Sequence, residues 1–228
     1  MINKRPTATS TSAAATRASA ATTRKPAAPT RKPAAERAAD IAAAARRVAV
    51  TDGLGAVTLR GVAAEAGVTS ALVAHYEPSI QALVARTFTE LATAELDEVK
   101  ALIATAADPI RGVRMLVSTL LAPARHELSA LWADAWSLGR RNPPLAEASR
   151  GAMAAWHGLA TAVIDRGVMS GDFTPGSSDR AALLIFALID ATTAYALVDY
   201  RAADERDELV RRTLEISLQI PSGGLSDL

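Results

Sequence analysis

The stretch AEAGVTSALVAHYEPSI, residues 64–80, decides how this chain folds. Gly67 separates two short segments with helical apolar spacing, and a glycine can adopt the left-handed backbone conformation that ends a helix. Thr69 or Ser70 can then cap SALVAHY, and a proline–serine step opens a longer helix. This layout is that of a helix-turn-helix DNA reader. It also occurs at ordinary corners between helices, so the motif alone leaves both interpretations open.

Helical periodicity extends in both directions from this stretch. Before it, AAERAADIAAAARRVAVTDG predicts a helix of about four turns, and Thr58 can cap LRGVAAEA. After it, a helix that begins near Ser79 is expected to reach about Ala106, a length of about 40 Å at roughly 1.5 Å per residue. Five further helices are expected, near residues 109–122, 125–141, 145–169, 178–199 and 204–219. Strand signals are nearly missing, so the sequence predicts an all-α chain of about nine helices.

Composition divides the chain into segments. Residues 1–33 hold seven Lys and Arg and no acid, and the repeat TRKPAA begins there twice, at Thr23 and at Thr30, which predicts a disordered basic arm. The whole chain has 25 Lys and Arg against 24 Asp and Glu, so the remainder carries 18 basic residues against 24 acidic ones. The arm suits either a solubilising tail or a segment that follows nucleic acid phosphates. The other expected boundaries are a helix-turn-helix DNA-binding domain at 34–80, a larger ligand-binding and dimerisation domain at 81–220, and a flexible tail at 221–228.

Several enzyme classes are not expected. Cysteine is absent, which excludes disulfides and thiolate metal sites, and the three histidines are scattered. Gly53 and Gly55 lack the preceding strand and the third glycine of a dinucleotide loop, and His126-Glu127 lacks the second histidine of a zinc protease helix. No serine lies in a nucleophile-elbow pattern. We therefore expect no catalytic residue, no metal and no cofactor. No secretory signal is present, so a cytoplasmic location is expected.

The segment AALLIFALIDATTAYALV, residues 181–198, approaches the length of a membrane span. An acid at its centre, Asp190, and an acid beside each end argue against a membrane. A helix that is apolar on nearly every side must instead be buried on nearly every side, which predicts a homodimer built from this helix and the last one. The predicted interface residues are Ala187, Asp190, Ala191, Ala194, Leu209 and Leu214.

Residues 37–85 resemble the DNA-binding domain of the TetR family of bacterial transcriptional regulators. The resemblance rests on GLGAVTLRGVAAEAGVTSALVAHY followed by PSIQALV, and LWADAWSLGRRNPPL is similar to the sixth-helix region of many members. It implies a sequence-specific DNA-binding regulator, more often a repressor than an activator. It also implies a homodimer that a small apolar or amphipathic ligand releases from a palindromic operator in double-stranded DNA.

The resemblance also implies which residues touch DNA. A hydroxyl and an arginine at the second helix contact the DNA. Three residues at the start of the recognition helix face base edges. A histidine and a tyrosine later in that helix pack and touch the DNA backbone. A serine at the N-terminus of the fourth helix favours a phosphate. These residues are Thr58, Arg60, Thr69, Ser70, Ala71, His75, Tyr76 and Ser79.

Three positions depart from the family pattern. Members commonly place a tyrosine near Ala74, a phenylalanine near Glu77 and a lysine near Ile80, so this chain loses a phosphate-contacting charge and Glu77 adds repulsion. The basic arm could compensate, because nonspecific affinity depends on how many phosphates are neutralised. Two alternatives stay open: a sequence-independent DNA-coating protein driven by the arm, and a ligand-binding dimer whose DNA reader has decayed.

The second domain holds candidate ligand contacts. Trp132 and Trp136 share a helix face, whereas Asp134 points to its opposite side and is a poor anchor for the same pocket. Tryptophans of an aromatic-poor chain also serve as core residues. The carboxylate of Asp190 needs a partner, which could be a dimer contact, Tyr195 or a cationic ligand. The predicted pocket residues are Met115, His126, Trp132, Trp136, Met153, Trp156, His157 and Phe186.

Overall fold

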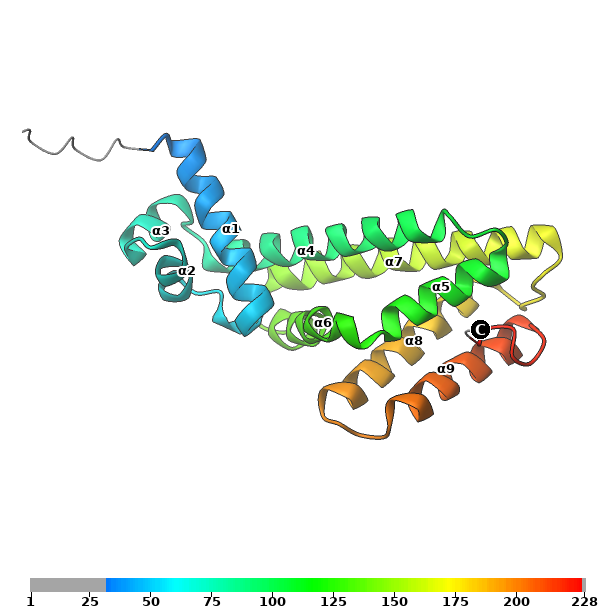
Figure 1. The fold of residues 1–228 in the computed structure, drawn as a ribbon. Helices are drawn as coiled ribbons and strands as arrows, with labels where there is room; N and C mark the ends of the chain where they lie inside the picture. The colour runs from blue at the N-terminus through cyan, green and yellow to red at the C-terminus, as the bar shows by residue number, and fades with distance from the viewer. Residues whose placement is uncertain (1–31, 227–228) are drawn as a thin grey trace, which may run out of the picture. The chain divides into compact units, whose positions relative to one another are not determined.

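The computed structural model describes residues 32–226, which form nine α-helices and two short 3-10 turns, with no strand in that range (Figure 1). The all-α prediction is confirmed. The predicted basic arm lies outside the described residues, apart from residues 32 and 33. The elements are α1 (Ala34–Asp52), η1 (Leu54–Ala56), α2 (Leu59–Ala66), α3 (Ser70–Tyr76), α4 (Ile80–Ile103), α5 (Pro109–Leu121), η2 (Pro123–Arg125), α6 (His126–Gly139), α7 (Pro143–Ser170), α8 (Ser178–Leu197) and α9 (Ala203–Leu218).

Side-chain caps fix where α2, α3 and α4 begin. The hydroxyl of Thr58 accepts a hydrogen bond from the backbone amide three residues later at 3.0 Å, and Thr69 and Ser79 each do the same at 3.2 Å. Each cap satisfies a backbone amide that the first helical turn leaves unpaired. Gly67 ends α2 in the left-handed region, with φ +64°. The expected glycine turn is therefore confirmed, with Thr69 rather than Ser70 as the cap of α3.

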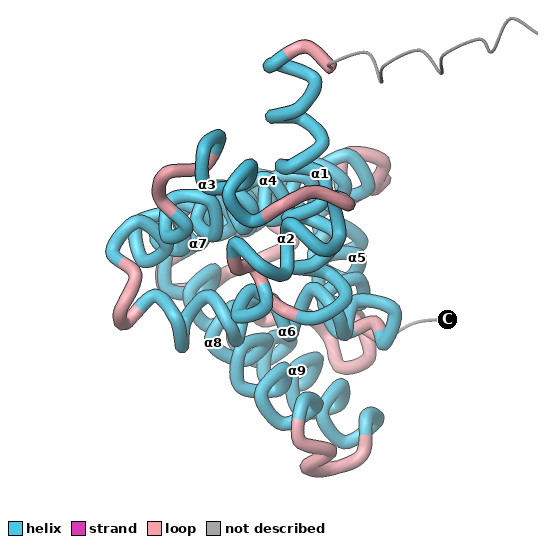
Figure 2. Tube along the Cα trace, turned by 90° about the vertical axis from the view of Figure 1, so that its left-hand side faces the viewer, coloured by secondary structure: helices cyan, strands magenta, loops and turns pink. Residues whose placement is uncertain are grey.

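Two buried clusters make up the core. The first joins α1, α2, α3, the N-terminal half of α4 and parts of α6 and α7, around residues such as Ile41, Val73 and Phe88. The second joins the C-terminal half of α4 to α5, α7, α8 and α9. Trp132 packs against both clusters, and α4 runs beside α7 (Figures 1 and 2). Because the described residues from 34 to 226 fall in one compact unit, the expected domain boundary at residue 80 stays a prediction.

Helix α4 ends at Ile103 rather than near Ala106. The hydroxyl of Thr105 donates a hydrogen bond to the carbonyl of Leu102 at 2.7 Å and satisfies one of the acceptors that a helix end leaves unpaired. Asp108 then caps α5 by accepting from the amide of Arg111 at 2.7 Å. The local polar residues therefore stop α4 a turn earlier than its apolar periodicity predicts.

The chain after α9 folds back onto the second cluster, so the expected flexible tail is wrong for residues 221–226. Leu225 is fully buried, and its amide donates to a carboxylate oxygen of Glu215 at 3.0 Å. Arg114 donates to the carbonyl of Gly224 at 2.6 Å, and Arg211 donates to the carbonyl of Leu225. One apolar anchor between small and polar residues gives only a weak sequence signal, which explains the wrong prediction.

Helix α8 is long and apolar enough to cross a membrane by length and composition alone. In the structure it packs against α5, α6, α7 and α9 and contributes Ala182 and Ile185 to the second cluster. A core helix of a globular domain has the same length and composition, so this feature is weak support for a membrane span.

Two glycines of α7 provide a matched test of packing. A Cβ at Gly167 would lie 2.1 Å from Cδ2 of the buried Phe173 ring, whereas no atom of residues 32–226 lies within 4 Å of a Cβ at Gly158. Alanine favours a helix by about 1 kcal/mol over glycine, and overpacking a core costs about 1–3 kcal/mol. Gly158→Ala should therefore raise the free energy of unfolding and Gly167→Ala should lower it, as measured by urea denaturation followed by circular dichroism. A stabilised Gly167→Ala variant would contradict this packing.

Candidate functional site

The predicted DNA-reading residues lie on α2, on α3 and at the N-terminus of α4. Ser70, Ala71 and His75 are exposed on α3, and the rings of His75 and Tyr76 meet edge to face with centroids 5.2 Å apart. Arg60 is exposed on α2, and within residues 32–226 no group bonds its guanidinium. The three capping hydroxyls stand at the N-termini of α2, α3 and α4, which favour anions. This surface presents small side chains and helix N-termini outward, as an element that enters a DNA groove must.

Glu77 is not an isolated negative charge. A guanidinium nitrogen of Arg86 donates to its carboxylate at 2.5 Å, and only 11% of the Glu77 side chain is exposed. Arg86 therefore offsets part of the Glu77 charge, and the expected repulsion toward phosphates stays a prediction. Ile80 stands where family members commonly have a lysine, so this position offers no positive charge to a phosphate.

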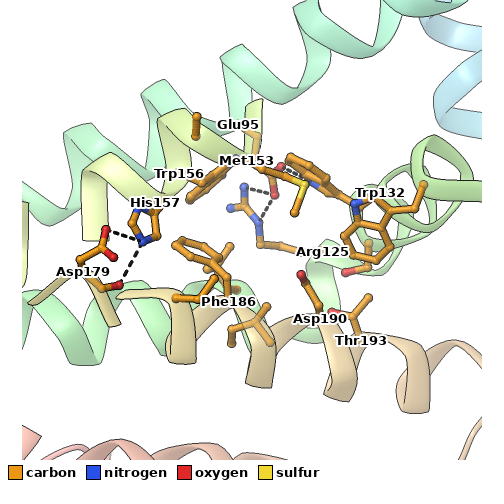
Figure 3. Close-up of a pocket in the computed structure, with 16 residues that line it drawn as sticks. Glu95, Arg125, Trp132, Met153, Trp156, His157, Asp179, Phe186, Asp190 and Thr193 are labelled. Atoms are coloured by element: carbon orange, nitrogen blue, oxygen red, sulfur yellow. Dashed lines mark hydrogen bonds and ion pairs between the residues drawn. The ribbon is translucent and has the colours of Figure 1, made fainter. Parts of the chain in front are cut away.

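A cavity of about 390 Å³ lies among α4, α5, α6, α7 and α8, with the η2 turn at its wall. Four aromatic side chains, Trp132, Trp136, Trp156 and Phe186, contribute to its lining together with Met153. Figure 3 shows Phe186 projecting from α8 toward Trp156 on α7. The volume falls in the range of small-molecule sites, and the lining is mostly apolar with a few polar groups.

Two predicted pocket residues, Met115 and His126, do not line this cavity. Met115 is five residues before the α5 lining residue Leu120, which places the two roughly 140° apart around the helix. His126 is exposed at the start of α6, whereas its neighbour Arg125 lines the cavity. The sequence predicted these helices correctly. It did not predict how α5 is rotated about its axis, or which residue at the start of α6 faces the cavity.

A buried polar network forms one wall of the cavity. Glu95 accepts two hydrogen bonds from Arg125 on one carboxylate oxygen, at 2.9 and 3.1 Å, and one from Nε1 of Trp132 on the other, at 3.1 Å. The side chains of Glu95 and Arg125 are only 5% and 14% exposed. The positive charge of Arg125 is thus already neutralised inside the protein.

Sequence reasoning missed both members of this pair. The available signal was Glu95 itself, an acid on the stripe that Phe88, Ala92 and Val99 continue along α4. An acid on a buried stripe requires a partner, for the same reason that Asp190 does. Arg125 gave no such signal, because it lies in a turn between two helices.

Asp190 lines the cavity, and its assignment to the dimer interface stays a prediction. Its side chain projects from α8 toward Arg125 (Figure 3), yet within residues 32–226 no group forms a hydrogen bond or an ion pair with its carboxylate. Burial raises the pKa of Asp190 to about 6. At pH 7 this carboxylate is therefore mostly ionised, and no group within residues 32–226 pairs with its negative charge.

The opposite end of the cavity is polar. Nε2 of His157 lies 3.1 Å from the backbone carbonyl oxygen of Asp179 and 3.5 Å from its carboxylate (Figure 3). Elsewhere, Nε1 of Trp136 and Nε1 of Trp156 are buried and have no hydrogen-bond partner among the described residues. The cavity thus combines an unneutralised acid, aromatic faces and a polar end at His157.

The predicted interface residues do not all reach the surface. Ala187, Ala191 and Ala194 are exposed on α8, and Leu209 is 50% exposed on α9. Leu214 is fully buried in the second cluster, so its assignment to an interface is wrong. The α9 face turned outward also carries an apolar residue that the prediction omitted, Ile216, which is 80% exposed.

Comparisons with known proteins agree with both parts of this arrangement. Residues 41–87 match the model of bacterial regulatory proteins of the tetR family, and residues 109–218 match the BetI-type transcriptional repressor C-terminal model. No curated protein matches the chain.

Solved structures share the fold. A transcriptional regulator from Saccharomonospora viridis in complex with choline has a TM-score of 0.70 and 22% identity, covering 79% of this chain and 96% of that one. A TetR-family regulator from Rhodococcus sp. has a TM-score of 0.67 and 14% identity, covering 81% and 99%. A regulator from Rhodococcus sp. Rha1 has a TM-score of 0.63 and 24% identity, covering 80% and 96%. With a helix-turn-helix domain followed by a helical ligand-binding domain, this chain belongs to the TetR family of bacterial transcriptional regulators.

Proposed function

We propose that this regulator is a cytoplasmic, dimeric repressor that a small organic cation releases from a palindromic operator. The observation that carries the ligand class is the unneutralised carboxylate of Asp190 in an aromatic cavity. The description of the C-terminal family model as that of a repressor supports the direction of regulation. The proposal includes no catalytic role.

The cavity suits a cation better than a neutral apolar molecule. A carboxylate that has lost part of its hydration gains most from an opposite charge, and aromatic faces attract cations through their quadrupoles. Arg125 cannot supply that charge, because Glu95 already pairs with it. The choline complex of the Saccharomonospora viridis regulator supports a quaternary ammonium ligand, and choline is therefore the probe of choice.

We place the dimer interface on the outer faces of α8 and α9. Ala187, Ala191 and Ala194 would let a second α8 approach closely, and Leu209 and Ile216 extend an exposed apolar surface on α9. Two copies related by a twofold axis would present two α3 helices to two half-sites, which is why the expected operator is an inverted repeat.

Selection of duplexes from a random pool tests the DNA-reading part of this proposal. At about 150 mM salt, where nonspecific attraction is strongly reduced, the protein should enrich an inverted repeat. Ser70→Ala and His75→Ala should each reduce the ratio of operator affinity to random-duplex affinity by about fivefold or more, because base contacts contribute about 1–3 kcal/mol of discrimination.

The matched control is Ser137→Ala, at an exposed serine of α6, which should leave the ratio unchanged. Binding without any enriched sequence, or equal ratios in the Ser70, His75 and Ser137 variants, would favour a DNA-coating protein instead. Absence of DNA binding would favour a decayed reader.

A further inference from the structure

Helix α6 lines the ligand cavity with one face and packs against α1 and η1 with the opposite face. Trp132 and Trp136 line the cavity. Leu131 and Ala135 belong to the first buried cluster, together with residues of α1, α2 and α3. Asp134 lies two residues from each tryptophan, roughly 200° around the helix, and so points away from the cavity.

Asp134 forms a hydrogen bond that spans eighty positions of the sequence. Its carboxylate accepts from the backbone amide of Leu54 at 2.8 Å. Leu54 is the first residue of η1, is 1% exposed and has no side-chain cap from the preceding Gly53. Asp134 thus acts as the cap of η1 from a distant helix, and it satisfies an amide that would otherwise be costly to bury.

The approach of Asp134 to this turn is close. Gly53 has φ +84°, and a Cβ there would lie 2.6 Å from the same carboxylate oxygen. After η1, only Val57 precedes Thr58, the cap of α2. A shift of α6 therefore has a short covalent path from Leu54 to the start of the helix-turn-helix.

We propose that Asp134 is the positioning residue that couples the ligand cavity to the DNA reader, through its hydrogen bond to the amide of Leu54. A ligand that displaces Trp132 or Trp136 rotates or shifts α6, and Asp134 carries that movement to η1 and to the N-terminus of α2. The inference rests on the proposed function, because it assigns a route between the two proposed sites. Coupling of the cavity to the DNA reader through movement of α4 alone would be a different route, and it would not depend on Asp134.

Hydrogen–deuterium exchange of the full chain tests this route without DNA. The cavity is perturbed in two ways, by adding choline and by the substitution Trp136→Leu. In the wild type, each perturbation should change exchange of the amides of residues 53–61 by about fivefold or more, within the usual range of coupling between sites. Asp134→Ala should abolish that response, and Asp134→Asn, which keeps an acceptor oxygen, should retain it.

The control is Glu127→Ala, at an exposed acid of the same helix that does not line the cavity, and it should respond as the wild type does. A purely structural role for Asp134 would raise the basal exchange of residues 53–61 but leave the response to both perturbations intact, and that result would overturn the inference. So would a wild type whose residues 53–61 do not respond to Trp136→Leu.

Tryptophan fluorescence separates the two claims. If choline leaves the fluorescence unchanged, the proposed ligand class fails, and the Trp136→Leu comparison alone decides the coupling. If Asp134→Ala does not give the circular dichroism of a folded helical protein, Asp134→Ser replaces it, because a serine hydroxyl is too short to reach Leu54.

Discussion

Asp190→Asn should weaken choline binding by at least about 30-fold, because losing one member of a partly buried charge pair costs about 2–5 kcal/mol. The asparagine keeps the size of the side chain but removes the negative charge that the cavity offers. Isothermal titration calorimetry measures the Kd for each variant. The matched control is Asp165→Asn, at an exposed acid of α7, which should bind choline as the wild type does.

A neutral analogue separates charge from shape. The alcohol 3,3-dimethylbutan-1-ol has the shape of choline without its charge, so wild type and Asp190→Asn should bind it with similar, weak affinity. If the substitution weakened binding of the alcohol as much as binding of choline, Asp190 would shape the cavity rather than attract a cation. The proposed ligand class would then be wrong.

The same carboxylate predicts how choline affinity depends on pH. Burial raises the pKa of Asp190 to about 6, so the free protein protonates this group as the pH falls through 6. Cation binding requires the ionised form, and the affinity should therefore fall by about tenfold between pH 7 and pH 5. His157, Asp179, Glu95 and Arg125 also line the cavity, so Asp190→Asn is the control that isolates the contribution of Asp190. A wild-type affinity that is constant over this range would contradict the assignment.

Glu95→Gln should lower the free energy of unfolding by about 3–5 kcal/mol, as expected when one member of a buried ion pair is removed. The amide would leave the charge of Arg125 without a counter-charge at a side chain that is 14% exposed. It would also weaken the acceptor for Nε1 of Trp132. Urea denaturation followed by circular dichroism measures the loss.

Two further variants define what Glu95 contributes. Glu98→Gln, at an exposed acid of the same helix, should change stability by no more than about 0.5 kcal/mol. Replacing Glu95 and Arg125 together by methionine should restore much of the loss, because no buried charge remains unpaired. A Glu95→Gln protein as stable as the wild type would show that water screens the pair.

The sequence predicted the helices well because each signal acts locally. Gly67 and the hydroxyls of Thr58, Thr69 and Ser79 fix helix ends through bonds that span three or four residues. The tail failed as a prediction because Leu225 is held by Glu215 and Arg211, ten and fourteen residues away, whose roles depend on how α9 is rotated.

The candidate site was predicted only in part. The aromatic members of the cavity follow from helical spacing, but Glu95, Arg125 and Trp132 are brought together from three different elements. Asp134 shows the limit most clearly. Helical spacing correctly predicted that its side chain faces away from the cavity, but no sequence pattern predicted its hydrogen bond to the amide of Leu54, eighty residues earlier. Tertiary contacts between distant helices cannot be read from periodicity.

The measurement that tests the central claim most directly is the Kd of the purified protein for its selected inverted repeat at about 150 mM salt, with and without saturating choline. Ligand-dependent repression predicts that choline weakens operator binding by about tenfold or more, within the usual range of allosteric coupling. An operator Kd that does not change while tryptophan fluorescence shows the cavity to be occupied would contradict it.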